Sequence, residues 1–238
     1  MDMDFLLGVI AFATSLIAAI IGFGGGMLLI AILPIFIAPT LVIPIHGITQ
    51  IASNASRAVF SFNYVKWSLL PAFLVGSIAG TILFGSVLYA LPTTFIPVAI
   101  GTYLLLNLWH RPFANFIRQF ESYYLIGLLQ TGLGLIVGAT GPLSLSVLTK
   151  DLKSKDEVVA TSAVFMTISH LAKIPVFMMV TQMLWQSLGL ILFMVIGSIL
   201  GSFVGTKLRL KADNTKLIAS IKLLLTLLAL HMIVAVFN

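Results

Sequence analysis

A glycine-rich break, Ile20-Ile21-Gly22-Phe23-Gly24-Gly25-Gly26, interrupts a long apolar run near the start of the chain and decides the fold. The apolar run before the break, residues 5–22, is long enough to cross a bilayer, whereas the run after it, residues 27–37, is too short. A full crossing by an α-helix takes about 20 apolar residues. The pattern therefore predicts a spanning helix, a break, and a half-helix that returns from a bend within the membrane.

A second break of the same kind, Ile136-Val137-Gly138-Ala139-Thr140-Gly141-Pro142, is also followed by a short apolar run, residues 142–148. A later pair of segments matches too, Val75-Gly76-Ser77-Ile78-Ala79-Gly80-Thr81 with Ile196-Gly197-Ser198-Ile199-Leu200-Gly201-Ser202. Transporter chains often contain a duplicated unit whose interrupted helices mark the binding site. We predict a first transmembrane repeat over residues 1–110, a cytoplasmic connector over 111–121, and a second transmembrane repeat over 122–238.

The composition excludes a water-soluble fold. Of the 238 residues, 60% are hydrophobic and only 8% are charged, whereas an ordinary soluble domain has about 25% charged residues. The net charge of +6 does not indicate nucleic-acid binding, because the basic residues are scattered and form no stripe with interleaved aromatic side chains. The absence of cysteine excludes thiol chemistry and thiolate metal sites. We expect an all-α polytopic membrane protein with about eight to ten membrane segments.

The distribution of charge predicts how the two repeats are oriented. In the first half, the loop at residues 39–43 is uncharged and the turn around Lys66 is basic. In the second half, the segment that corresponds to the first loop carries Lys150, Lys153 and Lys155. The segment that corresponds to the Lys66 turn, residues 181–184, is uncharged. Cytoplasmic loops are enriched in Lys and Arg. The exchange therefore predicts two repeats of inverted topology, with both termini on the outer side of the membrane.

Ionisable residues inside the apolar runs are few, and none of them is acidic. They are Arg57, Lys173, Lys222, His46, His170 and His231, whereas every Asp and Glu lies at a terminus or in a loop. A charge at membrane depth is costly and normally faces a cavity, so this imbalance favours an anionic ligand over a cation. The alternative is that Arg57 and Lys173 extend to the membrane surface. We expect Lys222 to do so, and His46 and His231 lie near the ends of their runs.

The glycine breaks supply a second element of an anion site. A helix that begins within the membrane presents unpaired backbone N–H groups and a positive dipole end. Pro142 fits the first position of such a helix, with Gly141 or Thr140 as its cap, and Gly24, Gly25 and Gly26 allow a ligand to approach the backbone. The alternative is close helix packing, which we prefer for the remaining glycine pairs at four-residue spacing, Gly76 with Gly80 and Gly197 with Gly201 and Gly205.

Two polar clusters complete the candidate site. Gln50, Asn54 and Arg57 share one helical face because of their spacing, and Thr167, His170 and Lys173 belong to the second cluster, although such polar groups also form interhelical hydrogen bonds. His170 is in addition a candidate for proton coupling. The candidate anion-binding residues are Gly24, Gly25, Gly26, Gln50, Asn54, Arg57, Thr140, Gly141, Pro142, Thr167, His170 and Lys173.

With these motifs in place, the chain resembles the TauE/SafE sulfite exporter family of bacterial membrane proteins over nearly its whole length. The most specific part is Ile21 to Gly26, followed by Pro34 and, after a short loop, by the polar helix through Thr49. The second repeat departs from the pattern, because Gly141-Pro142 stands where a glycine-rich run is expected. The resemblance implies an inner-membrane transporter of sulfite, sulfoacetate or another small oxyanion.

The mechanism we expect is alternating access, with the oxyanion held near the midplane between the two broken hairpins. The expected partners are this anion, the lipid bilayer, a coupling ion such as a proton, and a second copy of the chain. No enzyme, cofactor or metal site is expected, because the sequence contains no mid-membrane carboxylate pair and no HExxH zinc motif. The alternatives are an anion channel and a non-transporting membrane subunit of a larger complex.

Overall fold

The computed structural model describes residues 3–22, 24–88, 93–118, 122–152, 154–180, 184, 187–208 and 215–237. Within these residues the chain forms helices and no strand, which confirms the predicted all-α class. The α-helices are α1 (Met3–Ile21), α2 (Gly25–Ile32), α3 (Pro39–Phe60), α4 (Leu70–Leu88), α5 (Ile96–Trp109), α6 (Arg111–Arg118), α7 (Tyr123–Val137), α8 (Pro142–Asp151), α9 (Lys155–Val180), α10 (Leu188–Leu208) and α11 (Thr215–Val234). Short 3₁₀ turns occur at Leu33–Ile35, Phe62–Tyr64, Trp67–Leu69 and Thr93–Phe95.

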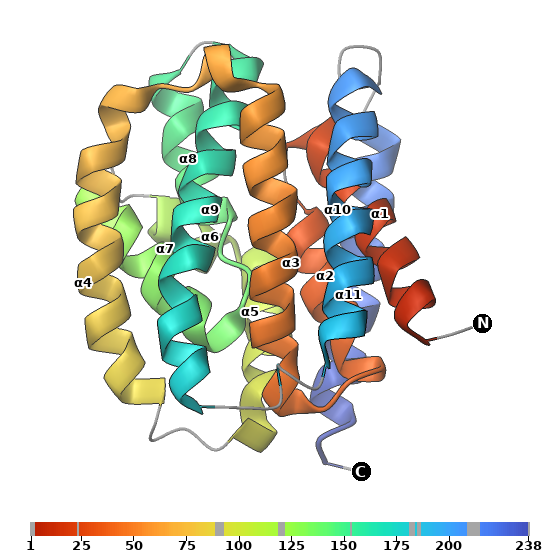
Figure 1. Cartoon of the computed structure of the whole chain (residues 1–238). Helices are drawn as coiled ribbons and strands as arrows, with labels where there is room; N and C mark the ends of the chain where they lie inside the picture. Colours follow the sequence, from red (N-terminus) through yellow and green to blue (C-terminus); the bar gives the residue numbers. More distant parts are fainter. Residues whose placement is uncertain are drawn as a thin grey trace.

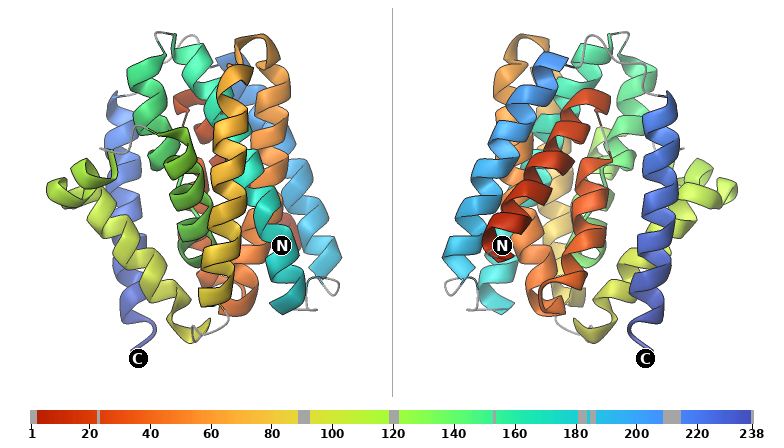
Figure 2. Two further views of the ribbon diagram at one scale, coloured as in Figure 1. Left: turned by 90° about the vertical axis from the view of Figure 1, so that its left-hand side faces the viewer. Right: turned by 90° about the vertical axis from the view of Figure 1, so that its right-hand side faces the viewer.

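The helices form a bundle in which two close pairs flank a central pair (Figure 1). Helix α1 packs along α10 on one side, α4 packs along α7 on the other, and α3 and α9 contact each other between them. Helices α5 and α11 make a further pair, and α6 projects from the body of the molecule (Figure 2). The predicted connector, residues 111–121, thus contains the helix α6.

Small residues permit the two close pairs. A Cβ added at Gly197 or Gly201 of α10 would collide with the carbonyl oxygen of Gly8 or Phe12 on α1. A Cβ at Gly76 or Gly80 of α4 would collide in the same way with the α7 backbone. Backbones approach this closely only where side chains are absent. The prediction that these glycines serve helix packing is confirmed.

Both predicted breaks are present, and each is followed by a short helix. The chain leaves α1 through Gly22 at φ 99°, and Gly24, at φ 90°, precedes α2. It leaves α7 through Gly138 at φ 76°. These are backbone conformations that glycine adopts and side chains resist. Helix α8 begins at Pro142 with Gly141 before it, as predicted, because a first helical position needs no N–H donor.

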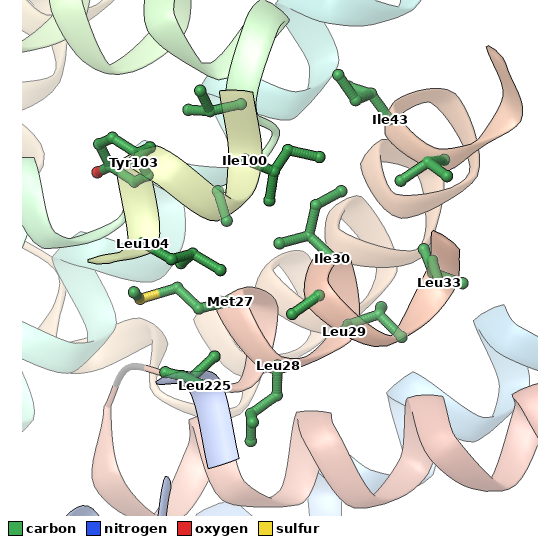
Figure 3. Packing of buried hydrophobic residues seen from close by; sticks show 14 of the residues in the cluster. Met27, Leu28, Leu29, Ile30, Leu33, Ile43, Ile100, Tyr103, Leu104 and Leu225 are labelled. Atoms are coloured by element: carbon green, nitrogen blue, oxygen red, sulfur yellow. The ribbon is translucent and has the colours of Figure 1, made fainter. Parts of the chain in front are cut away.

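Most residues of helix α2 are buried. Its residues Met27, Leu28, Leu29 and Ile30 lie among apolar side chains of α3, α5 and α11 (Figure 3). A helix that is apolar all round belongs to a protein core or to a membrane. The burial of this eight-residue helix fixes the position of the first break within the bundle.

Four described segments are long and apolar enough to cross a bilayer, namely Met3–Ile21, Trp67–Ser86, Lys155–Phe177 and Leu188–Leu208. Shorter apolar helices cover Gly25–Ile35, Ile96–Trp109, Tyr123–Val137 and Lys222–Val234. One expectation is wrong, because residues 39–43 form the first turns of α3 and not a loop. Pro39 fits the start of that helix, and Leu41, Val42 and Ile43 are buried by the packing that a helix allows.

Candidate functional site

A small cavity of about 40 Å³ lies where the two glycine breaks meet. It is lined from the first half by Ala18, Gly22, Gly24, Gly26, Met27, Gln50, Asn54 and Arg57, and from the second half by Ala139, Gly141, Ser162 and Met166. None of these lining residues is acidic. The cavity therefore has one formal charge in its wall, the guanidinium of Arg57.

Three polar residues of α3 form a chain of hydrogen bonds along the cavity wall. The amide nitrogen of Asn54 donates to the backbone oxygen of Gln50 at 2.7 Å and to Gln50 Oε1 at 3.2 Å. This orientation turns Asn54 Oδ1 toward Arg57, whose Nη2 donates to it. Arg57 is only 3% exposed, so its guanidinium is held at the cavity and does not extend to the surface.

The N-terminus of α2 forms another part of the wall. Gly24 and Gly26 line the cavity, and Gly24, the residue before α2, makes no side-chain cap. The N–H groups of a first helical turn have no partner within the helix and carry the positive end of its dipole. Gly25 faces away from the cavity, because a Cβ there would overlap the carbonyl oxygen of Thr14 on α1. Gly25 thus serves the close approach of α1 and α2.

The second break is bonded to the chain itself. Gln130 Oε1 accepts the Ser144 N–H at 3.0 Å and so caps the first turn of α8, and the Leu143 N–H donates to the Thr140 oxygen at 3.1 Å. The Thr140 hydroxyl donates to the Gln130 backbone oxygen at 2.6 Å, and Gln130 Nε2 donates to Ser169 Oγ at 3.0 Å. The Thr140 hydroxyl and the N–H groups of Leu143 and Ser144 are therefore bonded within the fold.

Sequence reasoning missed Gln130. This fully buried amide bonds to residues of the second break, but it belongs to neither of the two polar clusters that the sequence pattern indicates. A polar side chain within the apolar run of residues 123–138 was the signal that would have found it, because a buried amide must find hydrogen-bond partners. Ser162, Met166 and Met27 are further cavity residues outside the candidate set.

His46, His170 and Lys173 form a separate buried cluster next to both breaks. Lys173 Nζ donates to the Gly138 oxygen at 2.9 Å and lies 3.3 Å from His170 Nδ1. His46 Nε2 lies 3.0 Å from the Gly26 oxygen, and the two imidazole rings are 5.4 Å apart. The expectation that His46 lies near a span end is wrong. Because α3 begins at Pro39, His46 falls within the helix and is fully buried.

Thr167 is a candidate that does not line the cavity. The Thr167 hydroxyl donates to the Ala163 oxygen of its own helix at 2.8 Å. The side chain of Pro142 lies outside the described residues. Lys222 Nζ sits 3.8 Å above the ring of Trp109, and His231 is exposed on α11. The cavity thus unites six of the candidates, namely Gly24, Gly26, Gln50, Asn54, Arg57 and Gly141.

Comparison with known protein families identifies the family of this chain. The model of the sulfite exporter TauE/SafE family matches residues 7–232, which is nearly the whole chain. No match was found among curated proteins or among solved structures. Members of the matched family are membrane transporters of the sulfite-exporter type and not enzymes. The chain therefore belongs to the TauE/SafE family of sulfite exporters.

Proposed function

We propose that this protein transports a small oxyanion through the cavity between the two glycine breaks, and that sulfite is its main substrate. The observation that carries the proposal is the buried guanidinium of Arg57 in a cavity whose lining residues include no carboxylate. A guanidinium in the wall of a buried cavity attracts an anion and repels a cation, and this interaction is stronger there than in water.

The chemistry of the wall suits an oxyanion. A guanidinium offers a planar fork of N–H donors that matches two oxygens of one anion. The uncapped first turn of α2 adds backbone donors and the dipole of the helix. Gln50, held beside Gly26, is a further polar group at the same wall.

The size of the cavity favours a compact anion. One water molecule needs roughly 10–15 Å³ of cavity volume. The cavity of about 40 Å³ therefore accommodates a group of only a few heavy atoms. Sulfite, with one sulfur and three oxygens, belongs to this size class. Sulfoacetate is longer and requires the cavity to widen, so we place it second among the substrates.

Alternating access between two inverted repeats is the mechanism we propose. Its support is the way the two halves pack against each other. The first helix of the first half, α1, packs along the fourth helix of the second half, α10, and α7, the first helix of the second half, packs along α4, the fourth of the first half. Arg57 also lies 35 residues after Gly22, and Lys173 lies 35 residues after Gly138. In this proposal both termini lie on the outer side, and one repeat rocks against the other around the anion.

Flux of labelled sulfite into proteoliposomes tests the proposal, with empty liposomes as the blank and sulfate, thiosulfate and sulfoacetate as competitors. We expect saturable flux, which separates a carrier from a channel. Arg57→Ala should weaken sulfite affinity about 10- to 100-fold, because a hydrogen bond to a charged group is worth about 1.5–3 kcal/mol.

Two matched variants control this experiment. Arg57→Lys keeps the charge but loses the planar fork, so its affinity should fall between those of Arg57→Ala and the unchanged protein. Lys222→Ala removes a cation that lies outside the cavity and should leave affinity unchanged. Unchanged affinity in folded Arg57→Ala protein would overturn the assignment of the anion site.

A further inference from the structure

We propose that His46, His170 and Lys173 form a proton-binding site that couples proton uptake to anion binding in the neighbouring cavity. The inference rests on the proposed function and adds the coupling ion and its location. The three side chains come from α3 and α9, and each is at most 1% exposed. Two nitrogens of this cluster, His46 Nδ1 and His170 Nε2, are buried and have no hydrogen-bond partner among the described residues.

The hydrogen bonds indicate where the proton binds. A carbonyl oxygen only accepts, so His46 Nε2 carries the hydrogen that it donates to Gly26, at 3.0 Å. In a neutral imidazole the other ring nitrogen is then a bare acceptor. His46 Nδ1 is therefore a buried lone pair, and its protonation forms one N–H bond and turns the ring into an imidazolium. Lys173 Nζ lies 3.3 Å from His170 Nδ1, and an ammonium group can only donate, so a charged Lys173 places the hydrogen of the neutral His170 ring on Nε2.

Charge links this proton to the anion. Among the described residues, Lys173 acts electrostatically on both imidazoles and His46 acts on His170, and no carboxylate acts on either ring. An added proton is repelled by the Lys173 ammonium, and this repulsion is strong in a buried site. A negative charge in the cavity offsets it. By linkage, anion binding then favours proton uptake by the same factor by which the proton favours the anion.

The cluster is also bonded to the two elements that form the cavity. His46 binds the oxygen of Gly26, which lines the cavity, and Lys173 binds the oxygen of Gly138, whose neighbour Ala139 lines it. The backbone of each break thus lies between the cluster and the anion site. A change of charge in the cluster acts directly on the hydrogen bonds that hold both breaks.

Proton uptake during sulfite binding is the direct test. Purified full-length protein is titrated with sulfite in weakly buffered detergent solution, and a pH-sensitive dye counts protons. Sulfite itself titrates near neutral pH, so its contribution is removed by comparison with His46→Gln at the same pH. We expect the unchanged protein to take up one proton more per bound sulfite than His46→Gln does. By linkage, the ratio of the sulfite affinities of the two proteins then changes tenfold for each pH unit.

His231→Gln is the matched control, because His231 is exposed on α11 and its loss should leave the proton count unchanged. If His46→Gln does not fold, the same comparison is made with His170→Gln, which removes the other imidazole. Equal proton counts in the unchanged and His46→Gln proteins would overturn the coupling site while sulfite flux still supports the transporter. Absence of sulfite binding by the folded, unchanged protein would instead overturn the proposed function and, with it, the coupling.

Discussion

The two glycine breaks have similar sequences but different surroundings. At the first break, the residue before α2 is Gly24, which makes no side-chain cap, and Gly24 and Gly26 line the cavity beside Arg57. At the second break, Gln130 caps the first turn of α8, and Lys173 binds the carbonyl oxygen at the end of α7. The first break therefore keeps donors for a ligand, whereas the second uses its polar groups to stabilise the fold.

This difference teaches that a shared motif does not imply a shared role. A helix that begins inside a membrane needs partners for its first N–H groups, and either the ligand or the protein can provide them. In this chain the deciding residue is the buried amide of Gln130, which lies outside the motif itself. Matched substitutions at the two breaks test this comparison.

The largest effect is expected from adding a methyl group at Gly25. Its Cβ would overlap the Thr14 carbonyl oxygen, and backbone cannot move aside as a side chain can. Overpacking of this kind costs about 3 kcal/mol or more, so the thermal unfolding midpoint of Gly25→Ala should fall by roughly 10 °C. Gly141→Ala is the matched control, because its backbone is helical and its Cβ would meet only the end of the flexible Met166 at 3.4 Å. Equal midpoints for the two variants would contradict the distinction.

A smaller effect should separate Gln130 from Gln50. Gln130→Leu leaves the Ser144 N–H buried without its acceptor, which costs about 1–3 kcal/mol of folding stability. Gln50→Leu should lower sulfite affinity about two- to tenfold, because it removes a polar group from the cavity wall. Unfolding midpoints and sulfite affinities are measured for both variants. The comparison fails if Gln130→Leu weakens sulfite binding more than it destabilises the protein.

The smallest effect is expected at Thr167. Its hydroxyl donates to the Ala163 oxygen of its own helix and does not reach the cavity. Thr167→Val keeps the shape of the side chain and removes only this local bond, so sulfite affinity should stay within about twofold. Equilibrium binding of labelled sulfite to the two purified proteins checks this. A tenfold loss would return Thr167 to the anion site.

Much of the architecture could be predicted from local patterns. Gly22 and Gly138 end their helices, short helices follow both breaks, and the glycines spaced by four residues serve packing, all as predicted. These features depend on intrinsic backbone preferences and on the length of apolar runs. The first turns of α3 were missed because their helical form depends on the burial of residues such as Leu41 and Val42.

The candidate site could be predicted only in part. Gln50, Asn54 and Arg57 were grouped correctly, because spacing along one helix places them on one face. The role of Lys173 was not predictable, since its hydrogen bond to the Gly138 oxygen depends on how α7 and α9 pack. The position of His46 against His170 depends in the same way on the contact of α3 with α9.

The amino-acid sequence alone shows that this chain needs lipid as solvent, that its two breaks lie in a duplicated pattern, and that its apolar runs contain basic but no acidic residues. Composition, helix length and spacing are properties of the chain alone, which is why they could be read without coordinates. Only the tertiary structure decided which break keeps its donors, because a buried N–H group is satisfied by whichever acceptor the packing brings within about 3 Å. In this protein, that acceptor is Gln130.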